Sequence, residues 1–499
     1  MKSSAIRYIV GQRADLAYLG IAGAGGAGRG TSARLRADTL SNAKREMDMV
    51  SDRRFSQDSN LMKAAKVLGP RPSTPATASL ALALCLAALA APASAATLFT
   101  NARIHPVSSP AIENGQLLID GDKIVAVGAD LSAQAAGATR VDLQGQWLTP
   151  AFITANTVMG LTEIETVRGT VDVAEIGAVN PNARAEVAVN ADSENWGVAR
   201  ANGVLYAHVV PQVGQGGVIS GSSALVQLQG WTWEQMTVQA PVATHLMWPS
   251  TRLPPWLPAA MREEALKGAA AAREAIGKAF DDATAYAAAK KAGTLSGVDA
   301  RWEALLAVLD GRQRLFVHAL DLRQIREALD FAAARKLKIT LVGAQDAWRL
   351  RDEIKAADVG VILHGPFALP QRRHEAYDSN YRNAAQLAEI GIRFAIASDG
   401  TPFSASLERN LPHAAGHAVG FGLGWEQGLA AITLTPAQLL GVDDRLGSLE
   451  PGKLASFVVF NGDPLEVRSK LTAAYLNGEA IDLSSRHTRL RDKFQQKYD

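Results

Sequence analysis

A short apolar strand at residues 149–153, followed directly by a loop, most constrains how this chain can fold. The residues before it alternate in polarity and turn often, whereas the residues after it alternate between strand-like and helix-like segments. That order is typical of an α/β barrel entered from a different domain. We therefore expect a (β/α)8 TIM-like barrel that begins here. Asn156 and Val158 would follow its first strand, at the end where barrel enzymes place their chemistry.

The middle of the chain repeats a strand-then-helix rhythm. Such alternation predicts parallel strands joined by right-handed crossovers. The glycine-rich residues 214–221 interrupt it, and we expect them to form a mobile lid near the barrel mouth. The predicted strands are 203–210, 224–228, 314–319, 338–343, 359–364 and 392–400, and the predicted helices are 258–291 (one or two), 321–335, 344–356 and 381–389.

Both ends of the folded region have a β pattern that cannot form a core alone. Residues 97–148 contain strands and a hairpin that turns at Asp120-Gly121-Asp122, and residues 455–460 and 471–479 add a buried strand and a second hairpin. We expect these segments to form one small β-sandwich. The predicted domains are residues 96–148 (first part of the sandwich), 149–441 (barrel), 442–484 (second part) and 485–499 (a charged tail, expected to form a short surface helix).

The first 95 residues have a different composition from the rest. Residues 62–95 combine a basic start, an apolar run of Ala and Leu, and Ala93-Ser94-Ala95 before the expected cleavage, which is the pattern of a secretory signal peptide. Residues 1–61 show no sustained apolar period, so we expect a disordered or mis-annotated extension. The protein would then be periplasmic or secreted, with no membrane span after cleavage.

Removal of this leader changes the charge of the chain. The sequence holds 51 basic and 49 acidic residues, of which 13 and 6 lie in residues 1–95, so the remainder has a net charge of −5. This balance argues against nucleic-acid binding. The one cysteine, Cys85, lies in the predicted signal, which leaves neither disulfides nor thiolate metal ligands.

Three stretches point to a known family. The chain resembles the amidohydrolase superfamily, in particular the secreted branch similar to imidazolonepropionases, over residues 97–480. This resemblance implies metal-assisted hydrolysis, in which a divalent ion, often zinc, lowers the pKa of a water molecule and polarises a carbonyl group. The stretches are residues 101–104 with 121–124, residues 433–441, and residues 446–455 with 457–460.

The resemblance also assigns the site, and this sequence departs from it. The family places two His one residue apart after strand one, where Asn156 and Val158 stand here, and a His after strand six, where residues 342–343 are Val-Gly. Asp399 matches the strand-eight Asp, the group that takes the proton from the metal-bound water, and His318 matches the strand-five His. The binuclear centre of the family is therefore not expected.

Other residues near the predicted strand ends offer alternatives. His318, His364 and Asp399 would converge on a mononuclear zinc site, and Asn156 and His208 would bind substrate. For Asp399 a functional role is favoured over a structural one, because a buried carboxylate is costly without a role. A hydrogen-bonded core His is the alternative for His318 and the favoured one for His208 and His364.

Weaker candidates surround this set. Glu163 and Glu165 follow strand one and would add a carboxylate. His413 and His417 are spaced i,i+4, but Ala414 stands where a zinc protease needs Glu, so we expect surface or loop residues. Several tryptophans between residues 196 and 256 would pack under long loops or line an apolar pocket.

Three functions remain open from the sequence. The first is hydrolysis of a carbon–nitrogen bond in a small amide, cyclic amide or dipeptide, with a reduced or remodelled metal site. The second is an inactive homologue that serves as a periplasmic binding or interaction protein. The third is metal-independent hydrolysis with Asp399 and His318 as the acid/base pair. The expected partner is a small-molecule amide, and a homo-oligomer is compatible with the sequence.

Overall fold

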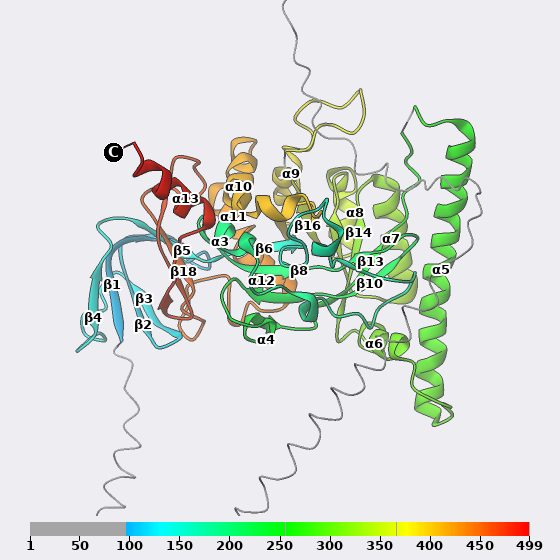
Figure 1. Ribbon diagram of the computed structural model, residues 1–499, viewed down its shortest axis with the longest axis horizontal. Helices are drawn as coiled ribbons and strands as arrows, with labels where there is room; N and C mark the ends of the chain where they lie inside the picture. Colours follow the sequence, from blue (N-terminus) through cyan, green and yellow to red (C-terminus); the bar gives the residue numbers. More distant parts are fainter. Residues whose placement is uncertain (1–95, 255, 366, 499) are drawn as a thin grey trace, which may run out of the picture. The chain divides into compact units, whose positions relative to one another are not determined.

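The computed structural model describes residues 96–254, 256–365 and 367–498 (Figure 1). The predicted extension at 1–61 and the predicted signal peptide at 62–95 lie outside these residues. The described segments belong to one compact unit, Ser94–Asp499. Within them, no helix combines the length and the apolar character needed to cross a membrane.

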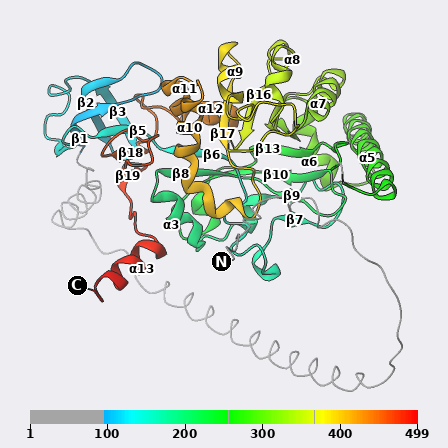
Figure 2. The same cartoon turned by 90° about the horizontal axis from the view of Figure 1, so that it is seen from above.

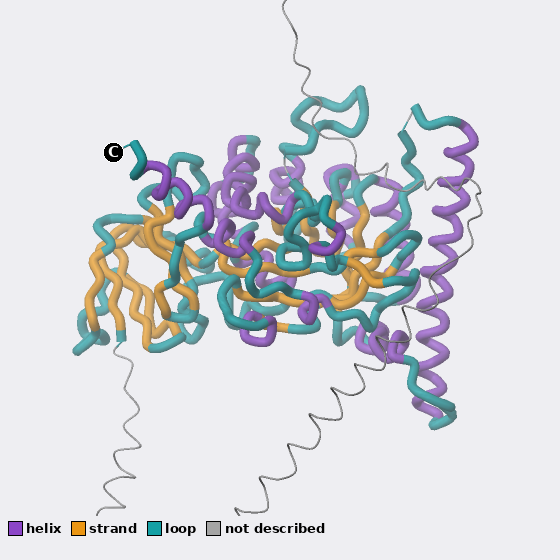
Figure 3. Tube along the Cα trace, viewed as in Figure 1, coloured by secondary structure: helices purple, strands orange, loops and turns teal. Residues whose placement is uncertain are grey.

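Strands from both ends of the described chain share one eight-stranded sheet (Figures 1 and 3). β18 pairs antiparallel with β5, so that Phe457 lies opposite Pro150. The two ends depend on each other, because neither set of strands has enough partners alone. The strands are β1 (Thr97–Ile104), β2 (Ile112–Asp120), β3 (Lys123–Gly128), β4 (Thr139–Asp142), β5 (Trp147–Pro150), β18 (Phe457–Phe460), β19 (Leu471–Leu476) and β20 (Glu479–Ala480).

A second group of strands follows β5 without a break. They form a four-stranded sheet in the order β12-β11-β8-β6 and a six-stranded sheet in the order β10-β13-β14-β15-β16-β17. β6 is parallel to β8, and β13 to β17 are parallel throughout. The bounds are β6 (Phe152–Thr157), β8 (Val204–Val209), β10 (Ile219–Ser222), β11 (Ala224–Gln227), β12 (Thr237–Gln239), β13 (Ala243–Met247), β14 (Arg314–Ala319), β15 (Ile339–Gly343), β16 (Gly360–His364) and β17 (Phe394–Ala397), with a short parallel pair, β7 (Ala174–Glu175) and β9 (Gln212–Val213).

The prediction of uniformly parallel strands is wrong for residues 219–227. β10 runs antiparallel to β13, and β11 runs antiparallel to β8. The connection from β8, residues 210–218, contains no helix. A parallel return requires a longer crossover, so the chain reverses instead. The predicted lid at 214–221 is thus partly strand, since it includes β10.

The two sheets meet along both edges. At one edge, Ser223 lies between β10 and β11 and is hydrogen-bonded to the start of β13. Ser223 N donates to Ala243 O (3.0 Å), and Val242 N donates to Ser223 O (2.9 Å). At the other edge, the Asn156 amide donates to Ser398 O (3.3 Å), and Ser398 Oγ lies 3.0 Å from Asn156 O. Among the described strands, no backbone ladder joins β6 to β17. The architecture is therefore mixed α/β, with side chains bridging one of its seams.

Helices cover the outside of the second group of strands (Figure 2). α7 begins with a capping box at Asp321 and ends at Lys336 in the left-handed conformation. The predicted helix at 344–356 is interrupted and forms only short segments. The α-helices are α3 (Glu194–Arg200), α4 (Trp233–Met236), α5 (Ala259–Ala292), α6 (Ala300–Leu309), α7 (Leu322–Arg335), α8 (Arg351–Ala356), α9 (Asn383–Glu389), α10 (Leu411–Gly420), α11 (Trp425–Ala430), α12 (Leu434–Leu440) and α13 (Arg486–Gln495), and the 3-10 helices are η1 (Arg168–Thr170), η2 (Ala185–Ala188), η3 (Ala347–Arg349) and η4 (Ser404–Asn410).

An aromatic cluster stabilises the terminal sheet. Phe457 is fully buried, stacks on Tyr475 with ring centroids 4.6 Å apart, and meets Phe99 edge-on at 5.0 Å. Because Phe99 comes from the N-terminal strands and Tyr475 from the C-terminal ones, these rings bind the two ends together.

Replacement of Phe457 by Ala should therefore destabilise the protein by about 3–5 kcal/mol, from lost burial plus the cavity left behind. Urea unfolding followed by tryptophan fluorescence measures this. Phe494→Ala, at a half-exposed position of α13, is the matched control and should change the free energy of unfolding by less than about 0.5 kcal/mol. Equal losses in the two variants would contradict this role of the cluster.

Candidate functional site

Four histidines lie on strands of the second group. His208 lies on β8, His245 on β13, His318 near the end of β14 and His364 at the end of β16. His245 Nδ1 is 2.9 Å from His318 Nε2, and the rings of His208 and His245 are 5.5 Å apart. The sequence reasoning missed His245. The sequence feature that could have indicated it is a single His within the mostly apolar residues 243–247, for which no strand was predicted.

His208 is held entirely by the protein. It is fully buried, its Nδ1 lies 2.7 Å from Ala155 O, and its Nε2 lies 2.7 Å from Ser223 Oγ. Since a carbonyl oxygen only accepts, Nδ1 donates and Nε2 accepts. Both nitrogens are used, so His208 has none left for the substrate contact predicted from the sequence. Its place beside Ser223 favours the structural alternative, a brace at the joint of β10 and β11.

Asn156 and His364 form the contact that links β6 to β16. Asn156 is buried, and its Nδ2 is 3.2 Å from His364 Nε2. An amide nitrogen only donates, so Nε2 of His364 accepts and the proton of the neutral ring is on Nδ1. Asn156 thus contacts another site residue, and its contact with substrate stays a prediction.

Two glycines make room for this pair. Gly343 (φ +95°) and Gly400 (φ +69°) both have left-handed backbone conformations, which glycine adopts without strain. A Cβ at Gly400 would collide with the Asn156 amide, and one at Gly343 would collide with Leu320 and approach His364 Nδ1 to 3.4 Å. Gly343, which stands where the resemblance would place a His, therefore lets Leu320 and the His364 imidazole pack against the backbone.

Asp399 is exposed, so the burial assumed in the sequence argument for its functional role is wrong. It follows β17 by two residues, and Gly400 turns the chain immediately after it. Its Oδ1 accepts hydrogen bonds from Thr401 N (3.1 Å) and Thr401 Oγ1 (2.9 Å). Because this carboxylate is exposed to solvent, its charge does not require a buried partner. Thr401 bonds only Oδ1, and Oδ2 takes no part in these two hydrogen bonds.

The histidines share an electrostatic environment that keeps them neutral. Burial lowers the pKa of His208 to about 4 and that of His245 well below its usual value. Burial also lowers the pKa of His318 to about 3, with further lowering from His364 and His208. Burial lowers the pKa of His364 to about 4, and the negative charge of Asp399 opposes this. At neutral pH the cluster therefore offers neutral imidazoles beside one carboxylate.

Glu408, on η4, is a buried acid that the sequence reasoning missed. It is 2% exposed, its Oε1 is 2.6 Å from Ser398 Oγ, and its Oε2 accepts from Thr154 Oγ1 at 2.7 Å. Burial raises the pKa of Glu408 to about 7, and the charge of Asp399 raises it further, whereas the hydroxyl hydrogen bonds oppose this. No sequence pattern marks Glu408, because its burial results from tertiary packing alone.

The donor set does not fit a metal ion. His318 Nε2 is hydrogen-bonded to His245 and His364 Nε2 to Asn156, so one ring nitrogen of each is engaged within the protein. Val158 is buried and offers no donor atom. Within the described ranges, no three His, Cys, Asp or Glu side chains are grouped as a metal site. The mononuclear zinc site predicted from His318, His364 and Asp399 is thus not formed by their arrangement.

The weaker candidates lie elsewhere. Glu163 Oε1 accepts from Asn190 Nδ2 (3.1 Å), and Glu165 is exposed in the same loop. His413 and His417 are on α10, which corrects their expected loop position. His417 packs against the rings of Phe367, Tyr381 and Phe421.

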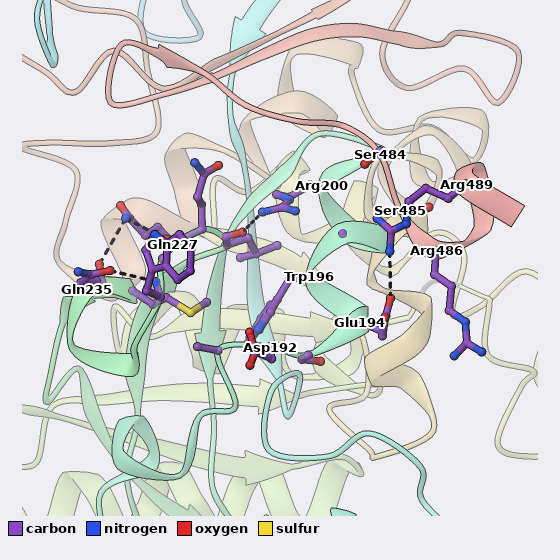
Figure 4. A pocket seen from close by; sticks show the side chains of 18 residues that line it. Asp192, Glu194, Trp196, Arg200, Gln227, Gln235, Ser484, Ser485, Arg486 and Arg489 are labelled. Atoms are coloured by element: carbon purple, nitrogen blue, oxygen red, sulfur yellow. Dashed lines mark hydrogen bonds and ion pairs between the residues drawn. The ribbon is translucent and has the colours of Figure 1, made fainter. Parts of the chain in front are cut away.

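One cavity lies apart from the histidines, beside α3 (Figure 4). Its volume is about 660 Å³, and it is lined by α3, by residues 227–236 and by the start of α13. Trp196 is buried against it, and its Nε1 donates to Asn190 O (2.8 Å). Trp231, also at its edge, is 90% exposed. Only part of the predicted tryptophan cluster therefore packs under loops.

Comparisons with known proteins agree on one family. A model described as the amidohydrolase family matches residues 311–483. The imidazolonepropionase of Pseudomonas aeruginosa (strain UCBPP-PA14) is 29% identical over 377 residues, covering 70% of this chain and 88% of that protein. The imidazolonepropionase of Syntrophobacter fumaroxidans is 36% identical over 114 residues, covering 23% of this chain, and this match spans about a quarter (25%) of that relative. An amidohydrolase from Thermotoga maritima MSB8, of known structure, has a TM-score of 0.66 at 23% identity, covering 77% of this chain and 99% of that one, which shows a shared fold.

The neutral histidines predict a loss of stability in acid. An unfolded His binds a proton below about pH 6.5, whereas folded His208 binds one only near pH 4. The unfolded state therefore binds more protons in this window, so the free energy of unfolding falls as pH falls from 6.5 to 4, by about 3 kcal/mol for His208 alone. Urea unfolding at several pH values measures the slope.

Two variants test the source of that slope. His208→Gln should reduce the pH dependence, and His487→Gln, at an exposed position of α13, should leave it unchanged. A pH slope that is the same in His208→Gln as in the wild type would contradict neutral burial of this imidazole.

Proposed function

Because the chain belongs to the amidohydrolase superfamily, we propose that it hydrolyses a carbon–nitrogen bond of a small molecule where β16 and β17 end. The observation that carries this proposal is the juxtaposition of His364 and Asp399. His364 is a neutral imidazole whose Nε2 is fixed by Asn156, and Asp399 is an exposed carboxylate whose charge acts on that ring.

These two groups supply complementary chemistry. The carboxylate of Asp399 accepts a proton from the attacking water, whose oxygen adds to the amide carbon. The Nδ1–H of His364 donates to the carbonyl oxygen as negative charge develops on it. A neutral imidazole can act as this hydrogen-bond donor without ionising. The proton then passes from Asp399 to the leaving nitrogen as the carbon–nitrogen bond breaks. No step of this proposed scheme uses a metal ion.

His318 has a supporting role in this scheme. Its Nε2 is engaged with His245, so it is not paired with Asp399 as the sequence suggested. We assign it to orientation of the cluster. The same proposal includes a closed eight-stranded barrel, in which residues 219–227 serve as one bent antiparallel strand and the bonds between Asn156 and Ser398 close the ring.

The similarity to imidazolonepropionases suggests the substrate class. The name of those relatives denotes action on an imidazolone ring. We therefore propose a cyclic amide or small linear amide as substrate and, from the signal-peptide pattern at 62–95, a periplasmic location.

A second candidate is an inactive homologue that binds small molecules. The observation that favours it is the replacement of the strand-one pair by Asn156 and Val158, together with the engagement of the histidine nitrogens within the protein. Such a protein would bind the same ligands without turnover, so an activity screen with a parallel binding measurement separates the two.

Asp399→Asn should lower kcat/KM at least about 100-fold, because the amide cannot accept the proton. The assay is a screen of cyclic amides, N-acyl amino acids and dipeptides with detection of the released amine. Asp443→Asn, at an exposed position away from these strands, is the control and should retain wild-type turnover. Ligand binding without turnover in the wild type would favour the inactive homologue.

Chelation provides an independent test. Dialysis against EDTA should change neither turnover nor thermal midpoint, and elemental analysis of the untreated protein should find zinc well below one equivalent. Stoichiometric zinc whose removal abolishes turnover and whose return restores it would overturn the metal-independent scheme and support a remodelled metal site.

A further inference from the structure

Glu408 has no part in the proposed chemistry, yet it lies directly beneath it. It contacts Ser398, next to Asp399, and Thr154, two residues before Asn156. Glu408 is therefore a buried acid that contacts β6 and the residue directly after β17, so its protonation state affects both sides of the seam.

The hydrogen bonds of Ser398 set the position of that proton. Ser398 Oγ lies 3.0 Å from Asn156 O and 2.6 Å from Glu408 Oε1. The hydroxyl carries one proton, and a backbone carbonyl can only accept. Both contacts are hydrogen bonds at once only if Ser398 donates to Asn156 O while Glu408 donates to Ser398. Thr154 Oγ1 donates to the other carboxyl oxygen, which completes the set.

We propose that Glu408 is a protonated carboxylic acid that positions Asn156 and, through it, the His364 imidazole. The order of donation is Glu408 to Ser398 and Ser398 to the Asn156 carbonyl, while the Asn156 amide donates to His364 Nε2 and to Ser398 O. This series of hydrogen bonds crosses the seam between β6 and β17, where the described strands share no backbone ladder.

The surroundings of Glu408 favour the neutral acid. Its contacts are uncharged hydroxyl groups, of Thr154 and Thr157 from β6 and of Ser398 after β17, and the lowering of the pKa by their hydrogen bonds is outweighed by burial. The charged group that acts on it is Asp399, a like charge, and burial without a cation disfavours ionisation. An acid whose pKa is raised to about 7 stabilises the fold fully below its unfolded pKa of about 4.5, and that stabilisation is lost as pH rises through 7.

The inference concerns protonation and orientation, and only its effect on turnover rests on the proposed function. Glu408 is a positioning residue, so its removal should act through His364. Loss of this hydrogen-bond series should displace the His364 Nδ1–H from the carbonyl oxygen of the substrate. A misplacement of about 1 Å costs roughly 100-fold in rate.

Infrared spectroscopy tests the proton directly. At pH 6 the wild type should show a carboxylic-acid C=O band that Glu408→Gln removes. Glu186→Gln is the matched control: Glu186 is equally buried, but its carboxylate is paired with Arg184 (Nη2 to Oε1, 2.6 Å), so its removal should leave that band unchanged. Absence of the Glu408 band at pH 6 would overturn the proposal.

The tautomer of His364 tests the positioning role. In ¹⁵N NMR spectra, His364 should show an unprotonated Nε2 that accepts a hydrogen bond. Glu408→Ala and Ser398→Ala should shift this signal and lower kcat/KM about 100-fold, whereas Glu408→Gln, whose amide still donates to Ser398, should rescue both in part. Ser398→Ala replaces Glu408→Ala if the latter does not fold.

The outcomes separate the two proposals. An unchanged His364 signal in both Ala variants would overturn the positioning role even if the acid band is present. A band and a signal that respond as expected, in a protein that turns over no amide, would leave this inference standing and reject the proposed hydrolase function.

Discussion

The seam between β6 and β17 is the contact on which the site depends. Other neighbouring strands of the second group are held by backbone ladders, but this pair is joined through the side chains of Asn156 and Ser398, with Glu408 beneath them. A seam made of side chains is specific, because each bond requires one residue type and one protonation state. The Asn156 side chain that bonds across this seam also contacts His364, so the seam and the position of that imidazole depend on the same residue.

In the proposed scheme, hydrogen bonding takes the place of metal ligation. Where the family has ligands, this chain has Asn156, Val158 and Gly343. Asn156 donates to His364 Nε2, and Gly343 leaves room beside that ring. Burial then keeps the imidazoles neutral. Neutral rings in a low-dielectric setting act as hydrogen-bond donors of fixed direction, which is the property that the proposed mechanism uses.

The terminal sheet supports this arrangement from outside. β5 belongs to that sheet and β6 to the next, with Ala151 alone between them. Phe152 on β6 stacks on Phe460 of β18, with ring centroids 5.9 Å apart. The first strand of the site is therefore anchored at its start by the C-terminal segment and at its end by the seam with β17.

Much of the fold and part of the site follow from the sequence alone. Strand and helix periods predicted β14 to β17 and α5, α7 and α9 closely, because apolar spacing is a local property. The motif positions pointed to Asn156, His318 and Asp399, and the end of a predicted strand pointed to His364. Tertiary structure alone decided that residues 219–227 run antiparallel, that His245 joins the cluster, that Asp399 is exposed and that Glu408 is buried. Each of these depends on which distant residues become neighbours, and burial and hydrogen bonding, unlike apolar spacing, exist only after those neighbours have met.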